Sequence, residues 1–73
     1  NLEAEADETA ITYANGTIRT TNIAERIEVY NLSGALVAFA ENTDAVRLDA
    51  PEGVYIVRAV TDGRSTVKKI IAE

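Results

Sequence analysis

Turn residues recur at short intervals along this chain, and their spacing constrains the fold more than any other feature. Between the turns lie short stretches in which apolar and polar residues alternate, the period of a half-buried strand. Turns about every 8–12 residues are typical of small all-β domains. The turn signals are Asn15-Gly16, Ser33-Gly34, the stretch 41–44, Pro51-Glu52-Gly53 and Asp62-Gly63.

The stretches between these turns predict an all-β fold of about seven short strands. We expect an immunoglobulin-like antiparallel β-sandwich of two sheets, in architecture only, because the chain has neither Cys nor Trp. Tyr55 and Val57 are expected in the core, since their face of the strand carries no charge. The strand at 35–41 is expected to be covered on both sides. The predicted strands are residues 10–13, 17–20, 27–30, 35–41, 46–49, 54–60 and 65–71.

Four glycines are expected to define the turns, because positive φ costs little only for glycine. Asn15-Gly16 and Asp62-Gly63 are strong signals for two-residue hairpin turns. Gly34 is expected to reverse the chain after Ser33. Gly53 is expected to close a tight turn after Pro51, whose ring presets φ. The predicted turn glycines are Gly16, Gly34, Gly53 and Gly63.

Composition argues against catalysis and against several kinds of partner. The 73 residues include no Cys and no His. Cysteine nucleophiles and thiolate zinc sites are therefore excluded, and the commonest acid/base residue and neutral metal ligand are missing. We expect no enzyme activity, no cofactor and no metal. The net charge of −5 disfavours binding to nucleic acid, and the apolar runs are too short for membrane insertion. Because the chain has no methionine, we expect it to be part of a longer protein.

The chain divides into two parts. Residues 1–9 hold four acidic residues and are expected to be a solvated linker, since crowded like charges extend a chain. Residues 10–73 are expected to form one β-domain. In the closing strand, strict alternation would place either Lys68 or Lys69 on the inner side. A bulge or an edge position would accommodate that lysine.

Three motifs in a fixed order resemble the C-terminal sorting domains of the type IX secretion system. Such domains carry an I-x-V-Y-N/D strand followed by x-x-G, then a G-V-Y-I/V-V strand, then a closing strand with paired lysines and isoleucines. The resemblance covers about residues 11–73. Many members also open with Y-P-N-P, whereas the one proline here is Pro51. The matching residues are Ile27, Val29, Tyr30, Asn31, Gly34, residues 53–57 and residues 68–71.

The resemblance implies a secretion signal. Related domains have an immunoglobulin-like fold, follow an N-terminal cargo domain in the same chain, and occur in Bacteroidetes-type bacteria. The resemblance implies passage through the periplasm and release or retention at the cell surface. The type IX translocon and a sortase-like peptidase are the expected partners. Cleavage is expected in the acidic segment before Ile11.

The candidate residues for recognition by the translocon are Lys68, Lys69, Ile70, Ile71 and Tyr30. For the lysines, a solvated edge strand is the simpler interpretation, and tyrosines more often pack in a core than bind a ligand. An alternative is an immunoglobulin-like spacer or accessory module of a large surface protein, with glycan binding as one role. Unpaired strand edges also predict a strand-exchanged dimer of the isolated domain.

Overall fold

The computed structural model describes residues 10–73, and every regular element in that part of the chain is a β-strand. All strand pairs are antiparallel, which confirms the predicted all-β antiparallel class. The predicted acidic linker, residues 1–9, lies outside the described residues. The strands are β1 (Ile11–Ala14), β2 (Thr17–Asn31), β3 (Leu36–Arg47), β4 (Gly53–Thr61) and β5 (Arg64–Ala72).

The described residues form five strands, so the prediction of seven is wrong. β2 and β3 each run through a segment that was expected to be a connection or a turn. The ladder between them continues from Thr17–Arg47 to Tyr30–Leu36, with a register shift between Arg19 and Ala24. Turn-type residues therefore bend these two strands without reversing them. Asn42, at φ 54°, takes the left-handed conformation within β3.

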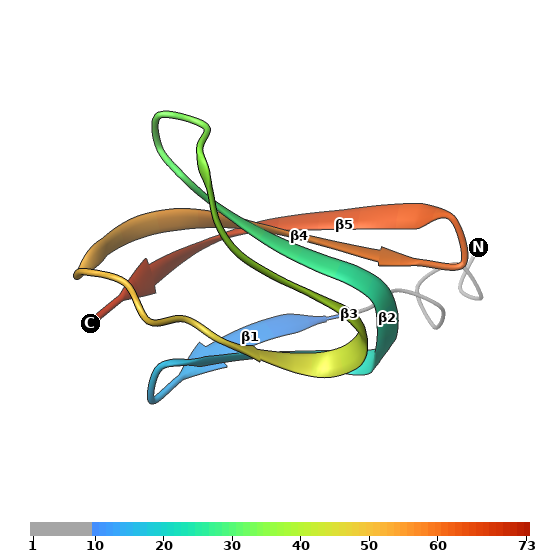
Figure 1. The fold of residues 1–73 in the computed structure, drawn as a ribbon. Helices are drawn as coiled ribbons and strands as arrows, with labels where there is room; N and C mark the ends of the chain where they lie inside the picture. The colour runs from blue at the N-terminus through green and yellow to red at the C-terminus, as the bar shows by residue number, and fades with distance from the viewer. Residues whose placement is uncertain (1–9) are drawn as a thin grey trace.

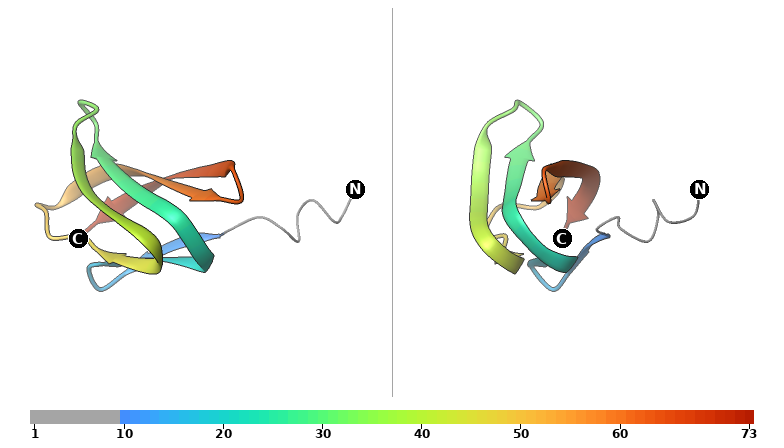
Figure 2. Two further views of the ribbon diagram at one scale, coloured as in Figure 1. Left: turned by 45° about the vertical axis from the view of Figure 1, so that its right-hand side comes forward. Right: turned by 90° about the vertical axis from the view of Figure 1, so that its right-hand side faces the viewer.

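One continuous sheet contains all five strands (Figure 1). β2 pairs with β3 along one side, and with β1 and then β4 along the other. β5 pairs with β4 and ends the order β1-β2-β4-β5. The bend in β2 and β3 carries both strands around the molecule, so the sheet is strongly curved (Figure 2). The immunoglobulin-like two-sheet sandwich stays a prediction.

The core lies on the inner, concave side of this sheet. Ile18, Ile27, Val29 and Val57 are fully buried there, at 0% exposure. The predicted core positions of Tyr55 and Val57 are confirmed. The Tyr55 hydroxyl donates to the Pro51 carbonyl oxygen at 2.6 Å, so its polar end is satisfied. The full set of buried apolar residues is Ile11, Ile18, Ala24, Ile27, Val29, Leu48, Tyr55, Val57, Ala59, Ile70 and Ala72.

Two hairpins have tight turns in which both central residues have positive φ. Asn15 and Gly16 lie at 52° and 77°, and Asp62 and Gly63 at the same two values. A type I′ turn requires this geometry, and it follows the right-handed twist of the flanking strands. These turns fix the registers of β1 on β2 and of β4 on β5.

β3 does not have the two-sided cover that was predicted for residues 35–41. Val37 is 40% exposed and Phe39 is 52% exposed, whereas Ala38 on the other face packs against the core. β3 is an edge strand that pairs only with β2. On its outer face the Arg26 guanidinium lies over the Phe39 ring. The apolar side chains of Val37 and Phe39 are therefore only partly buried within residues 10–73.

Candidate recognition surface

We call the convex side of the sheet the outer face. The strand registers align its residues in rows that cross β2, β4 and β5. One row holds Glu28, Arg58 and Val67, and the next holds Tyr30, Ile56 and Lys69. Val54 and Ile71 pair beyond them. Because side chains alternate along a strand, all of these residues point away from the core.

Glu28 is the centre of a polar network on the outer face. Arg26 Nε donates to Glu28 Oε2, and Arg58 Nη1 donates to Glu28 Oε1 at 2.9 Å. The Tyr30 hydroxyl donates to Glu28 Oε1 at 2.8 Å. Arg26 Nη1 also donates to Glu41 Oε2 at 2.9 Å, which links β3 to the network. Donors from β2 and β4 thus converge on the Glu28 carboxylate, and β3 joins the network through Arg26.

The network holds Glu28 as a carboxylate, although only 7% of the residue is exposed. Hydrogen bonds from Arg26 and then from Tyr30 lower the pKa of Glu28 to about 2. The same carboxylate raises the pKa of the Tyr30 hydroxyl by accepting its hydrogen bond. The donors stabilise the charged form more than burial penalises it. Within the network, the charges of Arg26 and Arg58 therefore balance those of Glu28 and Glu41.

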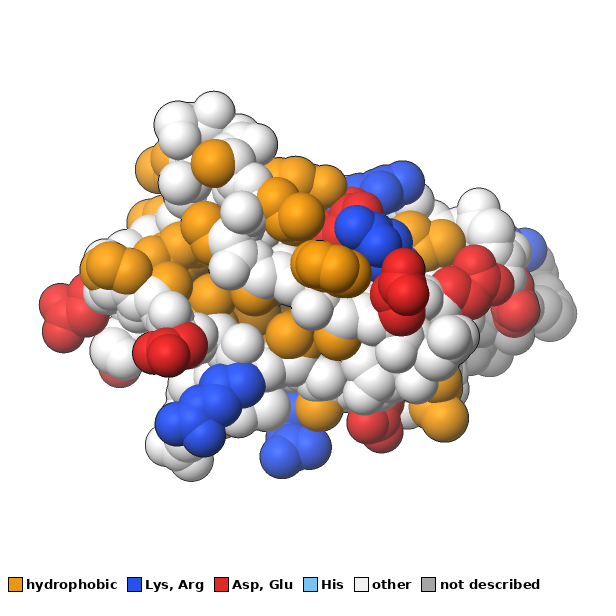
Figure 3. Space-filling model, viewed as in Figure 1, with side chains coloured by type: hydrophobic (Ala, Val, Ile, Leu, Met, Phe, Trp, Pro, Cys, Tyr) orange, Lys and Arg blue, Asp and Glu red, His pale blue; other side chains and the backbone are white. Residues whose placement is uncertain are grey.

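Apolar side chains adjoin this network. The Arg26 guanidinium lies over the Phe39 ring, 4.5 Å from its centroid. Leu36, Val67 and Ile71 are 45%, 60% and 62% exposed. In the space-filling view, hydrophobic side chains gather beside the acidic and basic ones below the β2–β3 hairpin (Figure 3). Exposed apolar groups beside satisfied charges are typical of a surface that binds another protein.

The predicted recognition residues separate onto the two sides of the sheet. Tyr30, Lys69 and Ile71 lie on the outer face, where Ile56 is the Cα partner of both Tyr30 and Lys69. Ile70 is 5% exposed and belongs to the core. Lys68 pairs with the buried Val57 and lies on the inner side. The structure thus brings together three of the five candidate residues.

Lys68 connects the last strand to the first. Its Nζ donates to the Ile11 carbonyl oxygen at 2.8 Å, across the open seam between β5 and β1. The alternation problem seen in the sequence is therefore solved by an edge position, since β5 has only β4 as a ladder partner. Lys69, on the opposite side, forms no ion pair within residues 10–73. The two adjacent lysines have different environments.

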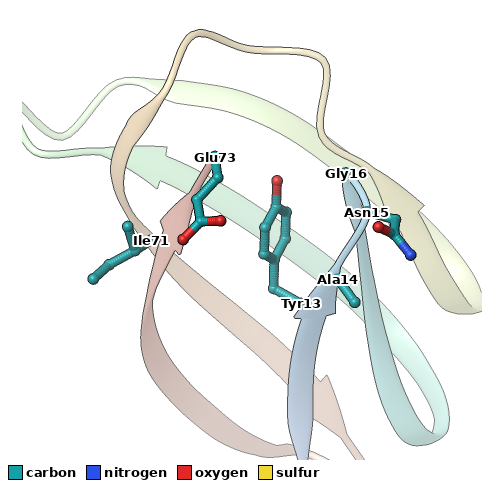
Figure 4. Close-up of a pocket in the computed structure, with 6 residues that line it drawn as sticks. All are labelled: Tyr13, Ala14, Asn15, Gly16, Ile71 and Glu73. Atoms are coloured by element: carbon teal, nitrogen blue, oxygen red, sulfur yellow. The ribbon is translucent and has the colours of Figure 1, made fainter.

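A hollow opens at the end of that seam, between the β1–β2 turn and the end of β5. Tyr13 and Glu73 point toward it, and Ile71 is directed away from Tyr13 (Figure 4). Ala14, Asn15 and Gly16 complete its wall. Glu73 carries the one carboxylate side chain of this lining, and Tyr13 carries its one hydroxyl group.

Residues 10–73 also give no other sign of a chemical site. They hold no group of acidic residues placed to bind a metal ion. Every buried side-chain nitrogen or oxygen in this part of the chain has a hydrogen-bond partner. No helix there is long and apolar enough to cross a membrane.

These features define a small antiparallel β-domain whose most distinctive site is an outer face with a polar network around Glu28 and exposed apolar side chains beside it. The family model of the secretion system C-terminal sorting domain matches residues 6–73. The chain belongs to this family, the C-terminal sorting domains of type IX secretion, as its motifs indicated. A search of curated proteins found no match. Family membership implies interaction with the type IX system, attachment to a cargo, and export to the cell surface or medium.

The polar network is the part of the site that sequence reasoning missed. The sequence motifs single out none of Arg26, Glu28 and Arg58. A signal was present, since Arg26, Glu28 and Tyr30 recur at the two-residue spacing of one strand face. Arg58 joins them only through the register of β4 on β2.

Proposed function

We propose that the type IX translocon recognises this domain in its folded form, through the outer face around Tyr30, Lys69 and Ile71. The observation that carries the proposal is the alignment of Tyr30 and Lys69 on either side of Ile56. Tyr30 and Lys69 lie far apart in the sequence and come to the same row of the outer face only when the sheet has formed. A folded domain would therefore be distinguished from an unfolded one.

The chemistry of this area suits a protein partner. Lys69 offers an exposed ammonium group, and Ile71 is 62% exposed beside it. Tyr30 is half-buried and held by Glu28, so its ring has a fixed orientation. Fixed aromatic and apolar groups lose little conformational entropy on binding, and a charged group at the rim gives specificity. We further propose that a sortase-like peptidase cuts before Ile11 once the domain has been recognised.

Glycan binding, one role of the alternative spacer or accessory module, has less support than protein binding. Binding of a sugar ring would require an exposed aromatic face. Within residues 10–73, Tyr55 is buried, and the Phe39 ring, although the residue is 52% exposed, packs against the Arg26 guanidinium. Tyr13 and Tyr30 are half-buried.

The test is export of the full cargo protein from a host with a type IX system. Deleting residues 68–73 would be ambiguous, because it also removes Ile70 and Ala72 from the core. We therefore compare Lys69→Gln with Lys68→Gln. Lys69→Gln is expected to reduce the exported fraction about fivefold or more, as expected for loss of an interfacial charge. Lys68→Gln is expected to have less than half that effect. Equal export of Lys69→Gln and wild type would contradict the proposed surface.

A further inference from the structure

The β2–β3 hairpin presents exposed apolar side chains that no other part of residues 10–73 covers. We call residues 31–37 the hairpin tip; it projects beyond the rest of the sheet in every view (Figures 1 and 2). Leu32 is 69% exposed, Leu36 45% and Val37 40%. Exposed leucines concentrated on a projecting turn are unusual for a small domain that needs its apolar residues for a core.

The tip is held in one conformation by Asn31. Its Oδ1 accepts hydrogen bonds from Ser33 N, Ser33 Oγ and Ala35 N at 3.0, 2.8 and 2.9 Å. The Asn31 carbonyl oxygen accepts from Gly34 N, and Asn31 N donates to the Ala35 carbonyl oxygen, both at 3.0 Å. A turn with so many internal bonds presents its side chains in a fixed arrangement. It therefore loses little conformational entropy when it binds.

A register shift at the base of the hairpin sets the direction of these side chains. Val29 pairs with Ala38 and Tyr30 pairs with Leu36, so Val37 is an extra residue in β3. Such a bulge re-aims side chains and twists an edge strand. Val37 is thereby kept out of the ladder with β2. The apolar exposure of the tip thus follows from backbone geometry.

The lack of charged residues at the hairpin tip limits the kinds of partner that the tip can bind. No charged residue occurs among residues 31–40, although the chain carries a net charge of −5. The nearest charged groups on the outer face, Glu28 and Arg58, are paired with each other. A nucleic acid or an anionic lipid surface would need basic residues, which the tip does not have. The tip matches an uncharged, concave, apolar recess in a protein.

We infer that the hairpin tip inserts into an apolar recess of an outer-membrane component of the type IX machinery, with Leu32 and Leu36 as the inserted side chains. This inference rests on the proposed function. Leu36 pairs with Tyr30, so the tip is continuous with the surface around Tyr30, Lys69 and Ile71. The lysine would orient the domain, and the leucines would supply buried apolar area. A projecting, preorganised apolar group has the features of a binding hot spot.

The test uses a matched pair of substitutions in the full cargo protein. Leu32→Asp places a charge at the tip, and Ile23→Asp places one at the bend of β2, where Ile23 is 67% exposed. Both variants are expected to melt like wild type, because both positions are exposed. Leu32→Asp is expected to reduce export about tenfold or more, as for loss of a hot-spot contact. Ile23→Asp is expected to stay within about twofold of wild type.

A photocrosslinking residue at position 36 provides a second measurement that does not depend on the aspartate variants. It is expected to form an adduct with an outer-membrane translocon protein, whereas the same residue at position 23 is not. Wild-type export with unchanged export of Leu32→Asp and no adduct at 36 would overturn the hairpin inference alone. Failure of the wild-type domain to direct export would overturn the proposed function itself.

Other occupants of the tip give distinguishable results with the purified full protein. Co-sedimentation with phosphatidylethanolamine–phosphatidylglycerol vesicles that is lost in Leu32→Asp would overturn the inference in favour of a lipid surface. A dimer in sedimentation velocity that Leu32→Asp converts to a monomer would overturn it in favour of a second copy of the chain. Neither is expected.

Discussion

The two sides of the same strands have different surroundings in this domain: one side packs in the core and the other carries an ion-pair network. On the inner side of β2 and β4, Ile27, Val29 and Val57 are fully buried. On the outer side of the same two strands, Glu28 and Arg58 form an ion pair within a solvent-facing network. Neighbouring residues along one strand thus alternate between the core and the outer face, where we propose that recognition occurs. We therefore expect that substitutions at two adjacent positions of one strand have different effects. The inner substitution should lower stability, and the outer one should lower export.

The largest difference in the free energy of unfolding is expected between substitutions of the two adjacent isoleucines of β5, which lie on opposite sides of the sheet. Ile70 is 5% exposed and Ile71 is 62% exposed. Ile70→Ala should lower the free energy of unfolding by about 2–4 kcal/mol, through lost apolar burial and the cavity left behind. Ile71→Ala should change it by less than about 0.5 kcal/mol. Urea denaturation followed by circular dichroism measures both. Equal destabilisation would contradict the assignment of the two sides.

The next largest change in the free energy of unfolding is expected from loss of the Glu28 charge at the centre of the outer face. This change depends on pH. Glu28 has a pKa of about 2 in the folded domain, below the ordinary 4.5. The contribution of the ionised Glu28 side chain to the free energy of unfolding is therefore complete above about pH 4.5. It is lost as the pH falls toward about 2. At pH 7, Glu28→Gln should cost about 1 kcal/mol, a value kept small because both arginines are partly solvated.

The measurement is urea denaturation of wild type and Glu28→Gln at a series of pH values between 7 and 2. The difference in the free energy of unfolding between wild type and Glu28→Gln should shrink as the pH falls from about 4.5 toward about 2. Glu52→Gln serves as the control, because Glu52 lies in the β3–β4 connection, outside the network. A difference that stays constant down to the lowest pH would show that the network does not stabilise the charged carboxylate.

The smallest effect is expected from the paired lysines. Lys68→Ala removes the hydrogen bond to the Ile11 carbonyl oxygen and should lower the free energy of unfolding by about 0.5–1 kcal/mol. Lys69→Ala should change it by only a few tenths, about the value for exposed sites. Hydrogen exchange of the β1 amides gives a local readout, since Lys68→Ala should speed exchange there. Unchanged exchange would indicate that the bond does not hold β1 against β5.

Alternating stretches and turn pairs predicted much of the fold because both act locally. The residues expected to form seven strands do lie in strands, apart from a few positions at the ends. The count was wrong because two apparent breaks, at 21–25 and 41–44, contain turn-type residues. In the structure these residues sit opposite each other, with Ala24 paired to Thr43. A bend shared by two paired strands keeps the ladder intact, which no local pattern indicates.

The recognition surface was predictable only in part, for a related reason. The motifs indicated Tyr30 and the residues of the last strand, and the family match supports the secretion function to which they pointed. The motifs could not distinguish Lys68 from Lys69 or Ile70 from Ile71. Period-two alternation divides a strand into two faces without stating which one is buried. The exposure of Leu36 and Val37 also depends on the bulge at the base of the hairpin.

By itself, the sequence determined the β character of this protein, its tight turns at Asn15-Gly16 and Asp62-Gly63, and its family. These follow from side-chain periodicity, from positive φ at turn residues, and from ordered motifs, all of which act over a few residues. The absence of charge beside Tyr55 and Val57 also predicted the buried side of β4. Only the tertiary structure decided the buried side of β5 and which residues meet across strands. The convergence of Arg26, Tyr30 and Arg58 on Glu28 requires the registers among β2 and β4. Registers are fixed by packing of the whole sheet, because a shift of one residue would move each apolar set to the solvent side.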